Sequence, residues 1–299
     1  KVYAENVPQL STYPTTVEAE VVNNITPQSA SRINEIMVEV GDHVKKGQKL
    51  ATMDAINLEK LRLQIQNDSI EYERTKELHK IGAVSQANYE AMTLAYEVSK
   101  KTYSNLLENT ILTSPISGIV TARNYDEGDM YAMAQPLFVV QNITPVKMLI
   151  NISENNYSKV KKGMEVDIVA DAFPGETFKG KVNLVYPTID ARTHTFPVEI
   201  LVDNKDEKLR PGMFTRVTVN YGTNYRVVVP DKAVLKQVGA DDKYVYVVNE
   251  DNTVTYTPVK LGTRMGDKYE IISGLDDGAT IVTTGQTRLK NNIKVDIVK

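Results

Sequence analysis

The side chains that most often carry enzymatic chemistry are absent or isolated in this sequence. Cysteine is absent, which excludes thiolate nucleophiles, disulfides and thiolate metal sites. The three histidines, His43, His79 and His194, are far apart along the chain, and none has a metal-type partner at motif spacing. The stretch 41–47 (Gly-Asp-His-Val-Lys-Lys-Gly) lacks the spacing of a phosphate-binding loop and is typical of a turn. We therefore expect no catalytic residues, no metal and no cofactor, and we expect that the protein is not an enzyme.

Composition and charge narrow the function classes further. The chain has 299 residues, of which 41% are hydrophobic and 24% charged, so it can form a globular core. Its formal net charge of −3 argues against a protein that binds nucleic acid by neutralising phosphates. No apolar run approaches the ~18 residues that span a bilayer. Because the sequence begins with Lys1 instead of Met, we expect any signal peptide or anchor to lie upstream.

One long region of the sequence is predicted to be helical, and its surface offers side chains for contacts with other proteins. Between residues 54 and 114 the sequence contains a single glycine, Gly82, and no proline. We expect a first helix over 56–81 with Asp54 as its cap, and a second helix that Ser85 caps and that ends near residue 107. The loop is so short that the helices must be antiparallel, and about 25 residues in each helix give a rod of ~38 Å.

The surface of this helix pair favours a protruding hairpin. Charged and amide side chains occupy most faces, whereas a helix pair inside a globular core would be apolar on more sides. Apolar residues at spacings of three and four predict the seam between the helices. The predicted seam residues are Leu58, Leu61 and Ile65 on the first helix, and Ala87, Ala91, Leu94 and Val98 on the second.

The segments on either side of the helices repeat each other. Residues 33–50 and 120–137 align at one constant offset, which matches Gly41 with Gly128 and Leu50 with Leu137. Each segment has a Gly-Asp turn, in which glycine permits a positive φ and aspartate bonds the local backbone. We therefore expect two β segments that are separated in the sequence by the hairpin.

The rest of the sequence has the pattern of strands and turns. Alternating apolar residues from Phe196 to Val202 predict a half-buried strand, and residues 226–299 contain several short β-rich runs. Residues 153–161 predict one short helix. The predicted fold class is mainly β with an inserted antiparallel α-helical hairpin.

The two repeated segments resemble the halves of a lipoyl or biotinyl carrier domain. Such a carrier has its modified lysine in the turn between the halves, whereas this chain has Met53, Asp54 and the helices there. A lipoyl-like module split by a helical hairpin instead resembles the periplasmic adaptors, the HlyD-type membrane fusion proteins of RND-type tripartite efflux pumps. Thr-Ser-Pro-Ile-Ser-Gly at 113–118 and Leu-Arg-Pro-Gly-Met-Phe at 209–214 are also similar to that family. Thr-His-Thr at 193–195 departs from the Thr-Arg-Thr that is common there.

The same resemblance implies a contact site at the tip of the hairpin. Adaptors that dock onto an outer-membrane channel often have Arg, then Leu four residues later and Ser seven residues after that. This chain has Arg74, Leu78 and Ser85 at those spacings. Arg74 and Leu78 share a helix face, where the guanidinium offers a planar fork of donors and the leucine an apolar knob. Ser85 offers a small donor and acceptor across the loop.

The resemblance further implies partners and a location for the whole chain. It implies a periplasmic adaptor that links an inner-membrane RND-type transporter to an outer-membrane channel, forms a hexamer in the pump, and binds no nucleic acid. It implies an anchor in the inner membrane of a Gram-negative bacterium through an upstream segment. Two alternatives stay open, an adaptor of an ATP-driven ABC exporter and a lipoyl- or biotinyl-type carrier protein. The implied domains of the elongated chain are a membrane-proximal β domain (1–12 and 226–299), a β-barrel (13–23 and 145–225), a lipoyl-like β-sandwich (24–53 and 110–144) and the α-helical hairpin (54–109).

Overall fold

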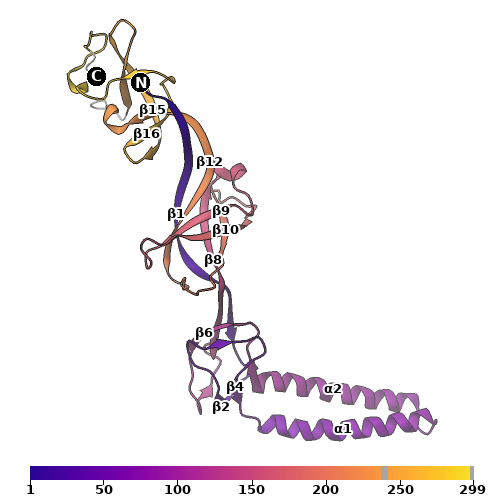
Figure 1. Ribbon diagram of the computed structural model, residues 1–299. Helices are drawn as coiled ribbons and strands as arrows, with labels where there is room; N and C mark the ends of the chain where they lie inside the picture. Colours follow the sequence, from indigo (N-terminus) through magenta and orange to yellow (C-terminus); the bar gives the residue numbers. More distant parts are fainter. Residues whose placement is uncertain (237–241, 297–299) are drawn as a thin grey trace.

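Three long strands connect the successive β units of the molecule. The computed structural model describes residues 1–236 and 242–296. In it, the first part of β1 (Ala4–Ile25) pairs with β12 (Phe214–Pro230), and from Val17 onward β1 pairs with β8 (Phe138–Ser153). Figure 1 shows the elongated chain that results, with both termini at one end and the helices at the other. The fold is mainly β with an inserted helical hairpin, as predicted.

The middle β unit is a closed barrel. Besides β1, β8 and β12 it contains β9 (Glu165–Ala170), β10 (Phe178–Val185) and β11 (Thr195–Val202). The strands follow the order β12–β9–β10–β11–β8, and β1 closes the barrel because it pairs with both β12 and β8. The predicted alternation in β11 is confirmed, since Phe196, Val198, Ile200 and Val202 are buried in the barrel core. The short helix predicted after β8 is a 3-10 helix, η1 (Glu154–Lys159).

The two repeated segments fold together into one smaller β module. The first overlaps β2 (Ser31–Ile36), β3 (His43–Val44) and β4 (Lys49–Met53), and the second overlaps β6 (Gly118–Arg123) and β7 (Met130–Tyr131). β5 (Ile111–Thr113) precedes the second segment. β2 pairs with β7, β3 with β6 and β4 with β5. Equivalent residues of the two segments, Ile33 with Val120 and Leu50 with Leu137, are fully buried in one core. The predicted repeat is therefore confirmed.

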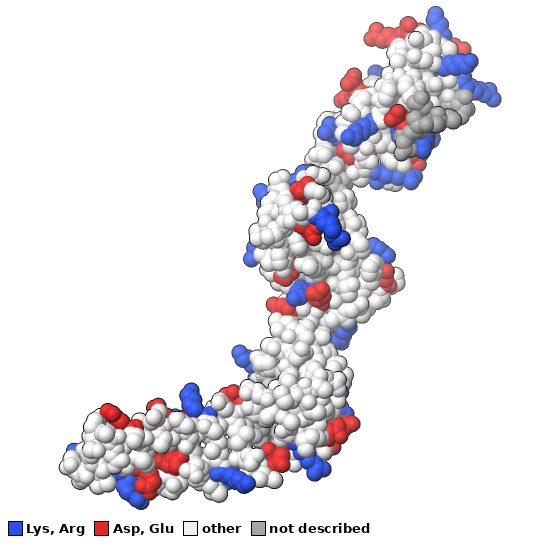
Figure 2. Space-filling model, turned by 180° about the vertical axis from the view of Figure 1, so that it is seen from behind, with Lys and Arg blue, Asp and Glu red and all other residues white. Residues whose placement is uncertain are grey.

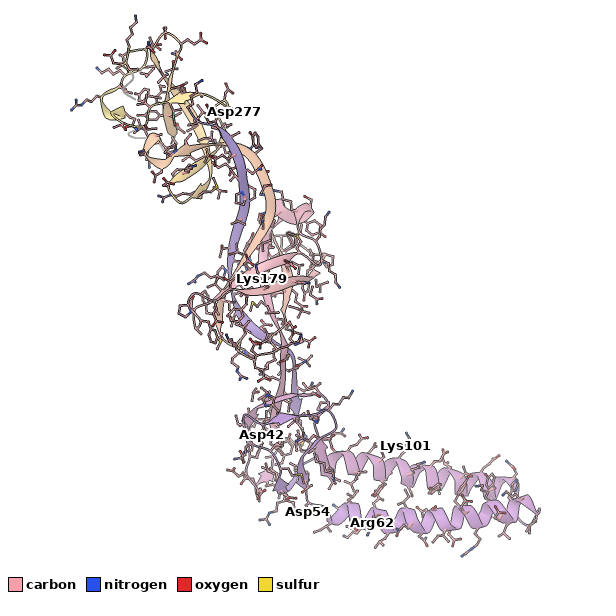
Figure 3. All side chains as sticks on the ribbon, viewed as in Figure 1. Asp42, Asp54, Arg62, Lys101, Lys179 and Asp277 are labelled. Carbon is pink, nitrogen blue, oxygen red and sulfur yellow. The ribbon has the colours of Figure 1, made fainter. Side chains whose placement is uncertain are left out.

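The insertion between β4 and β5 is an antiparallel pair of helices. α1 (Ile56–Lys80) and α2 (Gln86–Thr110) have 25 residues each, as predicted, although α2 continues past residue 107. The cap predicted for α1 is displaced by one residue, because Ala55 is the N-cap. Asp54 Oδ1 still accepts a 2.9 Å hydrogen bond from the Ile56 N–H, which supplies an acceptor to one of the unpaired amides of the first turn. Figure 3 labels Asp54 at this base, from which the hairpin projects sideways, away from the line of β units.

The third β unit contains the first residues of the chain and the last residues that the structure describes. β12 continues into this unit, where Val228 lies opposite Glu270. The Val2 N–H donates a 2.9 Å hydrogen bond to the Ala279 carbonyl, and the Val2 side chain joins the core of the unit. No helix in the described part of the chain is long and apolar enough to cross a bilayer. The elements of the unit are β13 (Leu235–Lys236), β14 (Lys243–Val248), β15 (Val254–Met265), β16 (Lys268–Ser273), β17 (Thr280–Ile281), η2 (Asp231–Ala233) and η3 (Gln286–Arg288).

Candidate docking site on the helical hairpin

The two helices contact each other along a seam with alternating spacings of three and four residues. On α1 the predicted seam residues Leu58, Leu61 and Ile65 are buried or half-buried, which confirms them. On α2 the predicted seam is wrong, because Leu94 and Val98 are 64% and 56% exposed. The seam continues through Asp68, Tyr72, Thr75 and His79 on α1, and is formed on α2 by Tyr89, Met92, Tyr96, Ser99, Tyr103, Leu106 and Thr110.

Tyrosine rings determine which face of α2 turns inward. Tyr72 stacks on Tyr96 with ring centroids 5.1 Å apart, and His79 stacks on Tyr89 at 4.8 Å. A hydrogen bond with Tyr89 raises the pKa of the Tyr72 hydroxyl. A tyrosine ring buries far more area than an alanine or valine side chain, so the aromatic stripe outcompetes the aliphatic one. The signal was available in the sequence, because residues 89, 96 and 103 are tyrosines at seven-residue spacing.

The loop at the hairpin tip is held by its own hydrogen bonds. Gly82 has a φ of 73°, and its N–H donates to the His79 carbonyl at 2.9 Å. The Ala83 N–H donates to the Leu78 carbonyl at 2.9 Å, which completes a Schellman motif. Ser85 Oγ accepts a 3.3 Å hydrogen bond from the Asn88 N–H, so Ser85 caps α2 as predicted. The tip is therefore pre-organised without contacts to the β units.

The structure gives each predicted contact residue a distinct environment. Arg74 Nη1 lies 3.0 Å from Glu71 Oε1 in an exposed ion pair. Leu78 is exposed one helical turn later, and Ser85 begins α2 across the loop. Ile81 was not predicted, although it is 77% exposed at the extreme tip. Its signal in the sequence was its position directly before the glycine that ends α1.

Ion pairs of one geometry line the exposed side of α1. Each joins an acidic residue to a basic residue three positions later. The hydrogen bond from Lys80 lowers the pKa of the Glu77 carboxyl. Figure 2 shows acidic and basic side chains interspersed along the visible face of the hairpin. The pairs and their distances are Glu59–Arg62 (2.9 Å), Glu71–Arg74 (3.0 Å), Glu73–Lys76 (3.0 Å) and Glu77–Lys80 (2.7 Å).

The histidines lie in three separate places. His43 Nε2 is 2.8 Å from Glu207 Oε1, a contact that joins the split module to the barrel. His194 Nδ1 is 3.3 Å from Glu154 Oε1 on the barrel, and His79 is stacked in the hairpin seam. Within residues 1–236 and 242–296, no three side chains of the His, Asp or Glu type come together as metal ligands would.

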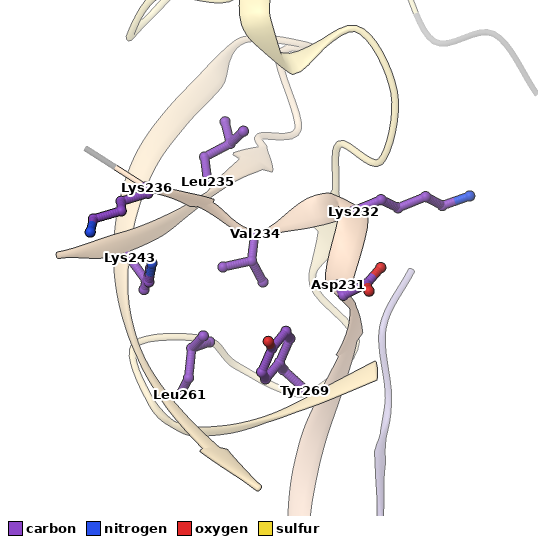
Figure 4. Close-up of a pocket in the computed structure, with 8 residues that line it drawn as sticks. All are labelled: Asp231, Lys232, Val234, Leu235, Lys236, Lys243, Leu261 and Tyr269. Atoms are coloured by element: carbon purple, nitrogen blue, oxygen red, sulfur yellow. The ribbon is translucent and has the colours of Figure 1, made fainter. Parts of the chain in front are cut away.

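A hollow of about 430 Å³ lies on the third β unit (Figure 4). Val234, Leu261 and Tyr269 line its interior, whereas Lys232 points away from it. Asp231 at its rim lies 3.0 Å from Arg264 in an ion pair. The hollow offers apolar contacts, and its carboxylate is already engaged. The hairpin tip is therefore the better defined candidate site.

Three protein-family models match successive parts of the chain. The first is described as the barrel-sandwich hybrid domain of RND membrane fusion proteins and matches residues 21–142. The second is a CusB-like β-barrel domain, at residues 146–223. The third is the C-terminal permuted SH3-like domain of YknX, at residues 226–297. Together they cover nearly the whole sequence.

Known proteins of similar sequence and fold agree with these matches. The multidrug resistance protein MdtA from Proteus mirabilis is 27% identical over 98% of this chain and 78% of its own length. MdtA from Xenorhabdus bovienii is 26% identical over 95% of this chain and 76% of its own length. A MacA–MexA chimeric protein with the α-hairpin domain of Pseudomonas aeruginosa MexA shares the fold, with a TM-score of 0.67 and 24% identity over 92% of this chain and 96% of that one.

Proposed function

Since the chain belongs to the membrane fusion proteins, the periplasmic adaptors of RND-type pumps, we propose that it links an inner-membrane RND transporter to an outer-membrane channel. The observation that carries the proposal is the hairpin, which projects away from the β units (Figure 1) and closes its own tip. A helix of 25 residues is ~38 Å long, so the tip can contact a partner that the β units do not reach. The proposed cargo is drugs or other toxic compounds, in keeping with the name of the MdtA relatives.

The tip has the chemistry for such a contact. Arg74 forms an exposed ion pair with Glu71, and pairs of this kind contribute little to stability. The Arg74 guanidinium can therefore leave Glu71 and bind a carbonyl or carboxylate of the channel. Leu78 supplies the apolar contact, and Ser85 can use its hydroxyl proton while its oxygen caps α2. The pre-organised loop reduces the entropy lost on docking.

The opposite end of the chain faces the transporter in this proposal. Residues 1–12 and 226–299 form the membrane-proximal domain and rest with the barrel on the transporter, in the periplasm and anchored to the inner membrane. The chain acts without catalysis. Because one narrow tip buries far less than the ~1,600 Å² of a specific interface, several copies in a ring, a hexamer, sum their weak contacts through effective concentration.

The test compares two arginines that have the same local geometry. Arg74→Asp removes the tip cation, and Arg62→Asp removes a cation with the same type of ion pair near the hairpin base. We expect Arg74→Asp and Leu78→Asp to lower the amount of outer-membrane channel that co-purifies with the adaptor roughly tenfold, as for central contact residues. Arg62→Asp should recover the channel normally, and the three variants should retain the thermal stability of the parent within a few degrees.

Normal channel recovery by both tip variants would reject the assigned site. Co-purification also identifies the transporter, so recovery of an ATP-driven exporter in place of an RND transporter would favour the ABC alternative. Intact mass of the chain from its host tests the carrier alternative, because a carrier has a covalent adduct on one lysine.

A further inference from the structure

A hollow of about 550 Å³ lies on the surface of the barrel, over the first half of β10 and the end of β11. We call it the barrel hollow. Its volume is in the range of sites that bind small molecules. It is remote from the hairpin tip, because the split module lies between the barrel and the hairpin (Figure 1). Its lining includes Pro145, Lys162, Lys179, Lys181, Leu201 and Asp203.

The floor of the barrel hollow is apolar. Leu201 turns away from the barrel core, because its neighbours Ile200 and Val202 are buried there and successive side chains of a strand alternate. Leu201 is half-buried and lies directly opposite Lys181 of β10. Pro145 adds a second apolar surface. These side chains offer an apolar contact that the barrel core does not use.

Lys162 stands at the edge of this floor without an acidic partner in the described parts of the chain. It is exposed in the turn before β9, and this turn is fixed beside β10 because the Gly163 N–H donates a 2.7 Å hydrogen bond to the Val182 carbonyl. Of the described residues that line the hollow, only Asp203 has a carboxylate, which lies 2.9 Å from Lys205 Nζ. The hollow therefore has a cation with no counter-ion and a carboxylate that is already paired.

Two further lysines of the lining are on β10. Lys179, which Figure 3 labels, pairs with Asp167 of β9, and Lys181 Nζ lies 3.9 Å from Glu165 Oε1. All four side chains are more than half exposed, and exposed pairs contribute little to stability. Because a lysine has a long flexible stem, both ammonium groups can turn from β9 toward an anion in the hollow.

An apolar floor beside lysines favours one chemical class of ligand. An alkyl chain can cover Leu201 and Pro145 and so remove apolar area from water. An anionic head group can bind Lys162, whereas a cationic one would find Asp203 already paired. A small inorganic anion would leave the apolar floor uncovered. The lining thus fits a compound that has both an alkyl chain and a negative charge.

We propose that the barrel hollow binds a single-chain amphiphile with an anionic head group, such as a fatty-acid carboxylate. The chain of the ligand lies against Leu201 and Pro145, and its head group binds Lys162, with Lys179 and Lys181 in reach. This binding site goes beyond the link between transporter and channel. It needs neither partner, so the purified chain is sufficient for a test.

Isothermal titration calorimetry with decanoate, below its micelle concentration, tests the site. We expect one decanoate to bind per chain, and decyltrimethylammonium, which has the same alkyl chain and the opposite charge, to bind at least roughly tenfold more weakly. Lys162→Glu reverses the charge at the head group, and Leu201→Gln removes the apolar contact. Each should weaken decanoate binding roughly tenfold, and added salt should weaken it in the parent.

Two matched controls lie next to these positions but outside the lining. Lys161→Glu changes the neighbouring exposed lysine, and Leu149→Gln changes an outward leucine of β8 that is 40% exposed. Both should bind decanoate like the parent, and circular dichroism checks that all variants fold. If Leu201→Gln does not fold, Lys162→Glu against Lys161→Glu decides. Equal affinity for the two amphiphiles, or equal weakening by the two lysine variants, would overturn the proposal.

Other occupants of the barrel hollow would give different results. If a membrane lipid occupies it, the chain binds vesicles that contain phosphatidylglycerol but not free decanoate. If a second copy of the chain covers it, Leu201→Gln lowers self-association in sedimentation and decanoate does not bind. Either result overturns the proposed ligand. Channel recovery by Arg74→Asp and Leu78→Asp does not involve the barrel hollow, so failure of one site is distinguishable from failure of the other.

Discussion

The barrel and the hairpin use apolar side chains in opposite ways. In β11 every second residue from Phe196 to Val202 is buried inside the barrel. In the hairpin, the seam contains Asp68 and His79, whereas Leu63 and Leu94 face solvent. The barrel thus takes its stability from its own core, and the hairpin leaves apolar area available for contacts outside the chain.

The barrel and the hairpin are therefore stabilised by different interactions. Leu58 and Thr75 are the buried residues of α1, so this helix gains little from the hydrophobic effect. It depends more on backbone hydrogen bonds and on the closure at Gly82, and its exposed ion pairs add little. Substitutions in the barrel core should therefore lower the free energy of unfolding of the protein, whereas substitutions on the hairpin surface should weaken the binding of partner proteins.

The largest expected effect is the loss of stability when a side chain of the barrel core is truncated, compared with a truncation on the hairpin surface. Ile200→Ala removes methylene groups from the fully buried barrel core and leaves a cavity, which should lower the free energy of unfolding by about 3 kcal/mol. Leu94→Ala removes the same number of carbon atoms from an exposed side chain and should change the free energy of unfolding by less than about 0.5 kcal/mol. Urea unfolding followed by circular dichroism measures both. Similar losses in the two variants would mean that the hairpin surface is part of the folding core after all.

The same contrast explains how much of the fold the sequence could predict. A strand has one buried and one exposed face with a period of two, so the alternation from Phe196 to Val202 has a single interpretation. Helix α2 has two stripes at heptad spacing, one aliphatic through Leu94 and one aromatic through Tyr96, and hydrophobicity alone favoured the wrong one. The choice depends on the side chains that α1 presents, which local periodicity does not contain.

The candidate site was predictable only through resemblance. The spacing of Arg74, Leu78 and Ser85 matches a family pattern, whereas a lone arginine on a charged helix has no distinguishing physical feature. The cap at Ser85 followed from the residue type and the helix start. The i,i+3 spacing of Glu71 and Arg74 permitted an ion pair within one helix, and the position of Ile81 before Gly82 pointed to the tip, but neither spacing nor position showed that the pair forms or how far Ile81 is exposed.

A smaller effect should appear when the tip closure is altered. Gly82 has a positive φ, so Gly82→Ala should cost about 1 kcal/mol, although a Cβ there meets no described atom within 4 Å. Gly82→Asn is the matched control, because asparagine tolerates the left-handed conformation better than alanine. Hydrogen exchange should show faster opening of the last turn of α1 in the alanine variant and unchanged protection in the barrel. Faster exchange in both regions would contradict a separate stability of the hairpin.

The smallest expected effect is the loss of the Glu77–Lys80 ion pair in the last turn of α1 when the pH is lowered. Lys80 donates a 2.7 Å hydrogen bond to Glu77 and lowers the pKa of its carboxyl. A carboxyl whose pKa is lower in the folded state stabilises that state above its unfolded pKa, and the contribution is lost as the pH falls through the folded value. Acidification below about pH 4 should therefore fray the last turn of α1, as read from its backbone chemical shifts, and salt should weaken the effect because both side chains are exposed.

Lys80→Gln supplies the control, since it lacks the ion pair. Its last turn should already be partly frayed at neutral pH, and this ion pair should contribute no acid-dependent step. If the parent and the variant titrate alike, the pair contributes nothing measurable to the tip. The turn would then depend on the hydrogen bonds around Gly82 alone, and the hairpin would present its contact residues through backbone geometry without help from surface charge.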